Sequence, residues 1–579
     1  MKKALIIISV VLIVLFLVVL FAVKTLSGIS GKSAASIDKA SILSVNLSKP
    51  YPERSTYNFS GFSFKKDSNF LSLIKTIETA AEDEDIIALS LKINGVSLSR
   101  SQLDEFSKAV EEFKDSGKPV YAFMPSAGMK GLLASSLADS VFMPPPSDFI
   151  LLGMAIMPMF YAGTAEKVGV GFDVIQIGDY KGAAEMFTQK GFTPPLRENY
   201  TSLLDDLYQN WIVKVAQRRD ITQEQLRAIV DKGTFEAEEG FEIGLIDGIL
   251  YPQEYKDKML SLVEDNDERI VSVSRYKSSK SFLSGKQKIA VIYCLGNIHS
   301  GESKDNPFKS NFSIGDETFM EAIDDAADDD NIEAIVLRVN SPGGSALASD
   351  FLWKSIIDAK EKKPVLVSMG GVAASGGYYI SMPADSIFCS EGTITGSIGV
   401  IFMKFNIEEL MTKVGITVDT ITRGSLADDF SLHKPMDPEA YDAFRRSTLA
   451  IYSDFTSKAA AGRGLELDSL LKLAEGRIWT GNQAVANHLA DRIASLSEVI
   501  DIAANMVSIP EEELGIVVYP KEKSFFKMAF EIYSGSAVGK LELPKEIENA
   551  FQPYIDLVSL YRYPEPLTLM PVRVIEGEN

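Results

Sequence analysis

The chain has 579 residues, which is too long for a single hydrophobic core, so we expect two or more domains. Hydrophobic residues make up 46% of it and charged residues 24%, the ordinary balance of a folded protein. The net charge of −21 argues against a surface that binds nucleic acid or an anionic membrane, and we expect no nucleic-acid partner.

Two cysteines, Cys294 and Cys389, each lie in an apolar, strand-like run, and the chain has three histidines. These residues form no spaced cluster of the kind that holds zinc, and the cysteines fit core positions better than a disulfide. We therefore expect no metal and no cofactor. A Ser-His-Asp triad is not excluded, but only three histidines could serve as its base.

An apolar run from Ala4 to Val23 opens the chain, after Met1-Lys-Lys. A helix of about 20 apolar residues spans the hydrocarbon core of a bilayer. No small-residue cleavage site follows, so we predict an uncleaved transmembrane anchor over residues 1–26, with the body of the protein across the membrane from Lys2 and Lys3. Residues 27–39, which are rich in Ser, Gly and Ala, are predicted to be a linker.

An internal repeat organises the rest of the chain, where strand-like and helix-like segments alternate as in α/β folds with crossover connections. Ile86–Asn94 aligns with Ile332–Asn340 at an offset of 246 residues, and Ala138-Asp-Ser140 aligns with Ala384-Asp-Ser386 at the same offset. The predicted divisions are an N-terminal repeat domain at 40–275, a C-terminal repeat domain at 285–510, and an unassigned C-terminal extension at 511–579.

One hydroxyl group stands in a turn of small residues in the second copy. Pro364–Met369 is apolar and predicts a buried strand, Tyr378–Met382 predicts a helix, and Ser375 lies between them among Gly and Ala. Such a turn lets another backbone approach and leaves N–H groups at a helix start for negative charge. A nucleophile needs both features. Taken alone, the same cluster is more often a helix start packed against a neighbour.

The two copies differ at the positions where chemistry would take place. Ser375 aligns with Met129 or Lys130 of the first copy, so the hydroxyl is missing there. In the other direction, Lys181 aligns with Ala427, so the amine is missing from the second copy. One copy keeps the serine and the other the lysine, as expected of a duplicated active site that has divided its two halves.

A serine hydroxyl needs a base to remove its proton, and a lysine serves as that base only when its amine is neutral. Lys181 follows the apolar strand pattern Val174–Ile177 and precedes Gly182-Ala-Ala184, a setting that favours burial. Two alternatives stay open. Most lysines in such turns are solvated, and Asp179 would raise the pKa of Lys181 if the two side chains paired.

Four motifs occur in a fixed order along the chain: Gly178-Asp-Tyr-Lys181, Asn340-Ser-Pro-Gly-Gly-Ser345, Ala373-Ala-Ser-Gly-Gly-Tyr-Tyr379 and Thr395-Gly-Ser-Ile-Gly-Val400. Together they resemble the signal peptide peptidase A (protease IV) family in its long, duplicated, membrane-anchored form. The resemblance covers nearly the whole chain to about residue 510. It implies an α/β fold of tandem Clp protease/crotonase-like domains, built from repeated ββα units and preceded by one transmembrane helix.

The resemblance also implies a Ser/Lys dyad, with Ser375 as nucleophile and Lys181 as general base. Ser397 matches the family serine whose hydroxyl holds the lysine amine in position. The alternative for Ser397 is a turn serine that satisfies local backbone groups. The backbone N–H groups of Gly343 and Gly376 match the oxyanion hole, with Gly344 as a close alternative.

Family members of this length assemble as homotetramers whose active sites face inward, and they degrade hydrophobic signal peptides left in the membrane. The resemblance therefore implies a serine endopeptidase acting on such peptides. It places the chain in the bacterial inner (cell) membrane as a single-pass protein, with the catalytic domains on the periplasmic or extracytoplasmic side.

Two other function classes are alternatives to the peptidase. A catalytically silent membrane scaffold would keep the fold and would not react with a serine-directed acylating probe. A crotonase-type acyl-CoA enzyme shares the oxyanion geometry, but no catalytic carboxylate is evident beside the Gly-rich loops. The Met-rich segment Ile150–Phe160 is open to four interpretations: a substrate-facing surface, a membrane-facing surface, buried core, or a subunit contact. Its counterpart in the second copy includes Ser397 and Ile398–Ile401, which favours lining of the catalytic groove.

Overall fold

The computed structural model describes residues 40–55, 57–60, 63–66, 68–263, 269–276, 285–304, 312–521, 567–570 and 575–576. The predicted transmembrane anchor (1–26) and linker (27–39) lie outside these residues. Among the helices of the described ranges, none is both long enough and apolar enough to cross a membrane.

The first copy is built around a parallel sheet of six strands in the order β11-β6-β5-β4-β1-β12. Parallel neighbours need crossover connections, and helices α2, α3 and α4 supply them between β1, β4, β5 and β6. The strands are β1 (Ser41–Asn46), β4 (Ile86–Lys92), β5 (Val120–Phe123), β6 (Ser140–Met143), β11 (Gly248–Ile249) and β12 (Ile270–Ser272). The helices are α2 (Phe70–Glu82), α3 (Arg100–Asp115) and α4 (Met129–Ser135).

The second copy repeats this arrangement. Its sheet runs β22-β20-β18-β16-β13-β24, with β19 beside β18 and β23 beside β19. Helix α11 begins 246 residues after α2, and α12 begins 246 residues after α3, so the tandem duplication predicted from the sequence is confirmed. The strands are β13 (Gln287–Leu295), β16 (Ile332–Ser341), β18 (Val365–Ala374), β19 (Ser386–Cys389), β20 (Ile394–Gly396), β22 (Ile478–Thr480), β23 (Arg492–Ile493) and β24 (Leu514–Tyr519). The helices are α11 (Asp316–Asp328), α12 (Ala346–Lys360) and α13 (Gly376–Ser381).

Further helices cover the sheets of each copy. The longest two, α7 and α15, occupy equivalent places in the two copies, and each begins with a proline in its first turn, where the missing N–H costs no hydrogen bond. In the first copy they are α5 (Ala162–Val168), α6 (Glu185–Thr188), α7 (Pro194–Arg218), α8 (Gln223–Lys232), α9 (Ala237–Glu242) and α10 (Pro252–Leu260). In the second copy they are α14 (Glu408–Lys413), α15 (Pro438–Arg463), α16 (Leu467–Leu473), α17 (Gly481–Ala486) and α18 (Leu496–Met506).

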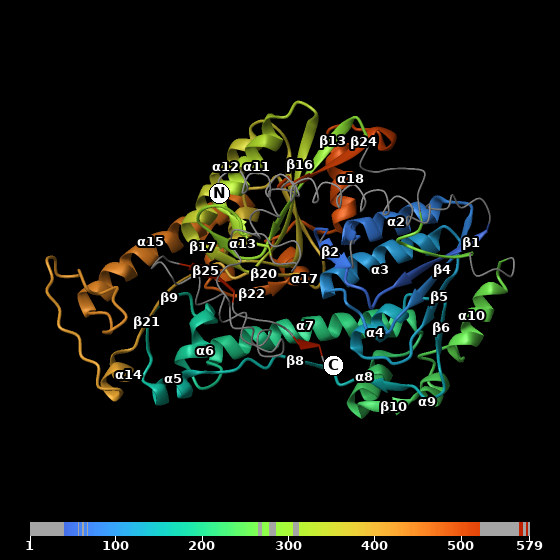
Figure 1. The fold of residues 1–579 in the computed structure, drawn as a ribbon, viewed down its shortest axis with the longest axis horizontal. Coiled ribbons are helices and arrows are strands. Elements are labelled where there is room, and N and C mark those ends of the chain that lie inside the picture. The colour runs from blue at the N-terminus through green and yellow to red at the C-terminus, as the bar shows by residue number, and fades with distance from the viewer. Residues whose placement is uncertain are drawn as a thin grey trace, which may run out of the picture.

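A third sheet joins the two copies, in the order β15-β14-β17-β25-β21-β9. Strand β9 belongs to the first copy and runs antiparallel to β21 of the second. Figure 1 shows β9 and β21 together at one end of the molecule, near β25 and β17. The strands are β9 (Gly171–Ile177), β14 (Ile298–His299), β15 (Ile314–Gly315), β17 (Gly343–Ser345), β21 (Val400–Asn406) and β25 (Leu567–Leu569). The remaining short strands are β2 (Tyr57–Ser60), β3 (Ser63–Lys66), β7 (Asp148–Ile150), β8 (Met154–Ala155), β10 (Thr234–Glu236) and β26 (Ile575–Glu576), with 3₁₀ turns at Gly182–Ala184 and Glu511–Glu513.

Each copy has its own hydrophobic core, and charged groups connect the two cores. Arg338 of β16 is fully buried and donates to both oxygens of Glu53, each at 2.9 Å, and to Glu105 at 2.7 Å. Glu105 in turn accepts from the backbone N–H of Leu496 at 2.8 Å. Because breaking a buried ion pair leaves an uncompensated charge, this cluster holds the two copies in one relative position.

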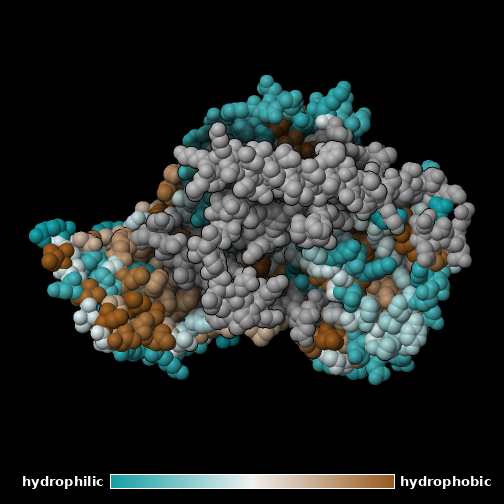
Figure 2. All heavy atoms as spheres, in the orientation of Figure 1, coloured by the Kyte–Doolittle hydropathy of each residue, from teal (hydrophilic) through white to brown (hydrophobic). Residues whose placement is uncertain are grey.

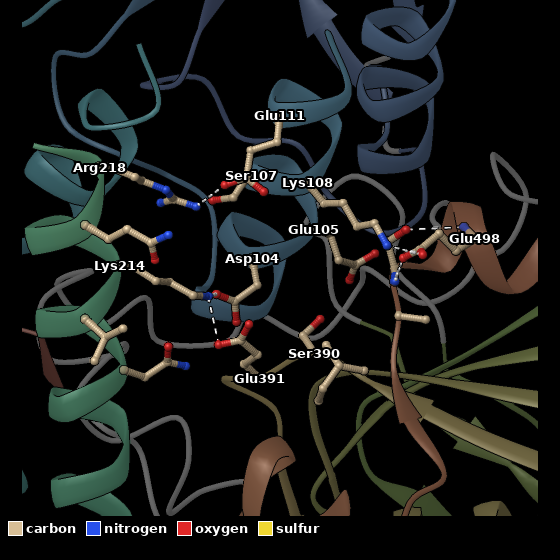
Figure 3. Close-up of a pocket in the computed structure, with 16 residues that line it drawn as sticks. Asp104, Glu105, Ser107, Lys108, Glu111, Lys214, Arg218, Ser390, Glu391 and Glu498 are labelled. Carbon is tan, nitrogen blue, oxygen red and sulfur yellow. Dashed lines mark hydrogen bonds and ion pairs between the residues drawn. The ribbon is translucent and has the colours of Figure 1, made fainter. Parts of the chain in front are cut away.

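A polar cavity of about 720 Å³ also lies between the copies (Figure 3). Lys214 of α7 crosses it to reach Asp104 of α3 at 2.8 Å and Glu391 of the second copy at 3.0 Å. Neither Ser375 nor Lys181 lines this cavity. It is therefore part of the contact between the copies, apart from the predicted catalytic residues.

Candidate active site

The structure brings three of the predicted residues together, although they come from different copies. The Lys181 Nζ lies 2.6 Å from the Ser375 Oγ, 2.8 Å from the Ser397 backbone oxygen and 2.9 Å from the Ser397 Oγ. All three residues are 0% exposed. A lysine from the first copy and two serines from the second thus form one buried polar cluster.

Ser375 lies at the sharp turn between β18 and α13. Its φ of +57° lies in the left-handed region, which costs a residue with a side chain about 1–3 kcal/mol and is concentrated at functional sites. Two backbone hydrogen bonds hold the turn: Ser375 N–H donates to the Gly396 oxygen, and Tyr379 N–H donates to the Ser375 oxygen, each at 2.8 Å. A Cβ on Gly377 would lie 2.5 Å from the Ser341 oxygen, which explains why the turn needs small residues.

Lys181 follows β9 and is placed by close backbone contact with the second copy. Gly178 has a φ of +105°, and a Cβ there would lie 2.3 Å from the Glu475 carbonyl carbon. Tyr180 N–H donates to the Glu475 oxygen at 2.9 Å. On the other side, a Cβ on Gly182 would lie 2.6 Å from Leu196. These contacts explain the glycines on both sides of the lysine.

The surroundings of Lys181 favour its neutral form. Burial of the amine away from water lowers the pKa of Lys181 well below its usual range. The atoms that contact Nζ are two hydroxyl oxygens and one carbonyl oxygen, and none of them carries a formal charge. Asp179, which the sequence left as a pairing alternative, is exposed, whereas Lys181 is fully buried.

Ser397 is held rigidly beside the lysine. It follows β20, has a φ of +52°, and donates its N–H to the Arg477 oxygen at 2.7 Å. Both its carbonyl and its hydroxyl are oriented toward the Lys181 amine. The carbonyl contact is one that the motif comparison did not suggest, since backbone oxygens leave no signature in a sequence.

The glycines of the predicted oxyanion hole lie close to Ser375. Gly376 is the next residue in the chain, and Gly343 lies on β17. The Gly343 N–H donates to the Ser341 Oγ at 3.1 Å, so a substrate carbonyl would compete with that hydroxyl for it. A Cβ on Gly344 would lie 1.9 Å from the Ile298 oxygen, because β14 pairs with β17 at this point. The oxyanion assignment stays a prediction.

A strand from the C-terminal extension lies beside these glycines. β25 runs antiparallel to both β17 and β21, with Leu567 opposite Ser345 on one side and Ile401 on the other. Leu567 is fully buried, and the Met570 N–H donates to the Pro342 oxygen at 3.0 Å. No sequence pattern predicted this strand, because three residues, Leu567–Leu569, are too few to show a period.

Two apolar pockets receive the side chains of this C-terminal stretch. Leu567 packs with Ala183 and Ala184, which follow Lys181, and with Ile401 of β21. Met570 packs in a second cluster that contains Leu196, Tyr200, Ala374, Ile394 and Ile478. β25 thus pairs with the facing edges of β17 and β21, and its neighbouring apolar side chains pack into two hydrophobic clusters.

The two cysteines lie apart from this cluster, whereas part of the Met-rich segment lies beside it, because Met154 and Ile156 pack against the group that contains Ala374 and Met570. Burial raises the pKa of the Cys294 and Cys389 thiols to about 12, which makes both inert. In the Met-rich segment, Met157 and Met159 are 65% and 52% exposed. No group of three or more His, Cys, Asp or Glu side chains in the described ranges is arranged to hold a metal.

The sequence of both copies matches one protein family. Residues 112–264 and 357–509 each match Peptidase family S49. The chain belongs to Peptidase family S49. Since the two matches fall one in each copy, the S49 domain itself is the duplicated unit of this peptidase.

Two relatives that match most of this S49 peptidase are named as proteases. It is 32% identical to "Serine protease SPPA, chloroplastic" of Arabidopsis thaliana, over 82% of this chain and 70% of that protein. It is 30% identical to "Protease 4" of Salmonella typhi, over 83% of this chain and 78% of that protein. The S49 peptidase is therefore a serine protease.

Among solved structures, the S49 peptidase matches the K138A mutant of the 1510-N membrane-bound stomatin-specific protease in complex with a substrate peptide. The identity is 17% and the TM-score 0.27, over 43% of this chain and 99% of that one. The roles of individual residues therefore depend on the geometry above.

Proposed function

We propose that the protein is a serine endopeptidase in which Ser375 attacks the peptide carbonyl and Lys181 acts as general base. The observation that carries this proposal is the 2.6 Å separation of the Lys181 Nζ and the Ser375 Oγ inside a fully buried cluster. A lysine can remove a proton from serine only when its own proton has left, and burial lowers the pKa of Lys181 in the required direction.

The hydrogen bonds around Lys181 suit both of its protonation states. A neutral amine has two N–H donors and one lone pair. With its donors on the Ser397 carbonyl and hydroxyl oxygens, at 2.8 and 2.9 Å, the lone pair faces the Ser375 O–H. After proton transfer, the ammonium retains the two Ser397 oxygens as acceptors. It then gives the proton to the leaving amine of the substrate.

The reaction then takes the two steps usual for acyl transfer. The Ser375 oxygen forms a bond to the substrate carbonyl, the peptide C–N bond breaks, and the amine product leaves with the proton from Lys181. Water attacks the acyl-enzyme in the second step, with Lys181 again accepting the proton; the ester C–O bond then breaks, the acid product leaves, and the proton returns to the Ser375 oxygen. The N–H groups of Gly343 and Gly376, with Gly344 as alternative, are the proposed donors to the oxyanion. This chemistry requires no metal and no cofactor.

The substrate is proposed to bind as an added strand in the place that β25 occupies. The edges of β17 and β21 would supply backbone hydrogen bonds, and the pockets around Leu567 and Met570 would accept apolar side chains. A site of this kind would favour extended peptides with apolar side chains. Cleaved signal peptides and other hydrophobic peptides are therefore the proposed substrate class.

Membrane anchoring is the remaining part of the proposal. The apolar run Ala4–Val23 supports a single-pass anchor in the bacterial inner (cell) membrane, with the catalytic domains on the periplasmic or extracytoplasmic side. Such a position would bring the groove close to hydrophobic peptides left in the bilayer. A homotetramer is the proposed assembly.

Acylation of the full-length protein in detergent tests the proposed chemistry. A serine-directed probe should label Ser375, as located by mass spectrometry of the digested protein, and Ser375→Ala should remove both the label and the peptidase activity. Lys181→Met should slow labelling by about 10²–10⁴-fold, the usual contribution of a general base. Circular dichroism checks that both variants fold. Labelling at another residue, rapid labelling of Lys181→Met, or no labelling of the folded wild type would overturn the proposal, and the last result would favour a silent scaffold.

A further inference from the structure

The loop that carries Lys181, residues 178–182, follows the strand that joins the two copies. Figure 1 shows β9 with β21 at one end of the molecule, and Figure 2 shows hydrophobic residues gathered over the same end, near α14. Apolar side chains of the two strands stand opposite each other there, as in Phe172 opposite Phe405. The ladder ends at Ile177, so the loop needs contacts of its own to place the lysine amine.

Residues 475–477 of the second copy, which we call the template, lie against this loop. The Tyr180 N–H donates to the Glu475 oxygen at 2.9 Å. Gly476 has a φ of +80°, and a Cβ on it would lie 2.5 Å from the Lys181 Cα. No side chain fits in that distance, so the glycine lets the template backbone touch the backbone of the lysine itself.

The template also holds the serine on the other side of the lysine amine. The Arg477 oxygen accepts the N–H of Ser397 at 2.7 Å, and a Cβ on Gly396 would lie 2.9 Å from that same oxygen. Gly396 in turn accepts the N–H of Ser375 at 2.8 Å. The Ser375 turn, the Ser397 turn and the lysine loop are therefore connected through one short segment of the second copy.

The side chain of Arg477 makes a further contact with the lysine loop. Its guanidinium carbon lies 3.9 Å from the centre of the Tyr180 ring and 5.4 Å from the centre of the Trp479 ring. It also pairs with Glu198 of α7 at 2.5 Å, but the Glu198 side chain is 60% exposed. Because an exposed ion pair contributes little, the cation–π contact with the Tyr180 ring is the main hold of this side chain on the loop.

The first copy lacks this arginine. Strand β10 is the equivalent of β22, since the two begin 244 residues apart, the same offset that relates Asp247 to Asp491. The residue before β22 is Arg477, whereas the residue before β10 is Gly233. The arginine therefore occurs in the copy that carries the candidate nucleophile and is missing from the copy that lacks it.

We propose that Arg477 is a positioning residue for the pair of Lys181 and Ser375. Its carbonyl orients Ser397 and its guanidinium holds Tyr180, so one residue sets both sides of the lysine amine. It makes no hydrogen bond to the amine itself, whose partners in the described structure are Ser375 and Ser397. The inference rests on the catalytic roles proposed above, and it predicts that the contact with Tyr180 keeps water away from the base.

The charged groups near the loop decide how this contact is tested. On the loop and the elements packed against it they are Asp179, Glu185, Arg197, Glu198, Glu475 and Arg477. Loss of the Arg477 charge would by itself raise the pKa of Lys181, because a nearby positive charge lowers it. Tyr180→Leu removes the same contact without changing any charge, so it separates loosening of the loop from loss of charge.

The rate at which a serine-directed probe acylates Ser375 measures the effect, in full-length protein in detergent. Arg477→Ala and Tyr180→Leu should each slow acylation by about 10-fold, the size expected for loss of a cation–π contact at a partly buried site. The double variant should be no slower than either single variant, because both changes break one contact. Tyr180→Phe keeps the ring and should keep the rate. Arg227→Ala, which removes a guanidinium carbon 5.3 Å from the centre of the Tyr208 ring, should also leave the rate unchanged.

The pH dependence of acylation gives a readout that a merely structural role would not move. Burial lowers the pKa of Lys181, so water admitted by a loosened loop should raise that pKa toward its ordinary value. The curve of rate against pH should therefore shift to higher pH in Tyr180→Leu and keep its position in Tyr180→Phe. Gly476→Ala should produce the same upward shift, whereas Gly244→Ala, at the same φ of +80° with nothing within 4 Å of its Cβ, should not.

Circular dichroism identifies the variants that fold, and Tyr180→Leu tests the contact from the first copy if Arg477→Ala does not fold. Labelling of Ser375 in the wild type, together with wild-type rates in the folded variants, would overturn the inference and leave the proposed function standing. Additive losses in the double variant, or a curve of rate against pH that does not move, would do the same. A wild type that is not labelled at Ser375 would overturn the proposed function and this inference with it.

Discussion

The hydroxyl of Ser397 gives the sharpest test of how the lysine is positioned. It provides one of the three oxygens around the Lys181 amine, at 2.9 Å, while the Ser397 carbonyl provides another at 2.8 Å. Ser397→Ala removes the first and keeps the second. A hydrogen bond of this kind contributes about 0.5–1.5 kcal/mol net, which corresponds to a loss of about 2–13-fold in kcat/KM. The loss should fall on kcat, because the hydroxyl contacts the lysine.

The backbone of Ser397 calls for a matched control. Its φ of +52° strains any residue with a side chain, so alanine keeps the strain and glycine relieves it. Ser397→Gly also lacks the hydroxyl, and both variants should lose activity to a similar extent on a fluorogenic peptide. Thermal unfolding measures any difference in stability between them. Full activity in both variants, or full activity restored by glycine alone, would refute the positioning role.

Three further predictions concern the base, its loop and the groove. Because burial lowers the pKa of Lys181, kcat/KM should fall as the pH drops through that lowered pKa. The rate should reach its plateau well below pH 10.5, the ordinary pKa of a lysine. A pH–rate profile centred near 10.5 would contradict the assignment. Gly178→Ala should shift the lysine loop and reduce activity, whereas Gly117→Ala, at a similar φ of +82° with nothing within 4 Å of its Cβ, should leave kcat/KM unchanged. Leu567→Asp should release β25 from the edges of β17 and β21 and so lower KM for long peptides that bind in its place. Burying a leucine contributes about 2 kcal/mol, which corresponds to a roughly 30-fold change in how often β25 occupies that place. An unchanged KM would show that β25 does not compete with substrate.

The duplication and the catalytic candidates could be predicted because both leave local marks in the sequence. Ser375 and Lys181 stand in motifs of small residues, and comparing the two copies showed that each copy lacks what the other keeps. The close contact of their side chains agrees with that prediction, but their catalytic roles remain proposals. The domain boundaries and the anchor at 1–26 also stay predictions.

Other features depend on contacts between distant parts of the chain. The burial of Lys181 depends on the packing of β9 against β21. Residues 417–423, the counterpart of β9 in the second copy, have a similar apolar pattern but are exposed in the same chain, so the pattern alone does not predict burial. The hydrogen bond from Gly343 to the Ser341 hydroxyl depends on a turn geometry that two glycines alone do not specify. The place of β25 depends on two strand edges more than 150 residues away from it in sequence.

The division of Lys181 and Ser375 between the two copies has a consequence for biosynthesis. Translation proceeds from the N-terminus, so the amine of residue 181 leaves the ribosome long before the hydroxyl of residue 375. Neither half alone carries both groups, and the Arg338 cluster that fixes their relative position forms only once the second half has folded. A growing chain therefore lacks the pair of Lys181 and Ser375 until both copies have been made and have packed together, so the proposed peptidase activity would be absent during synthesis of the first copy.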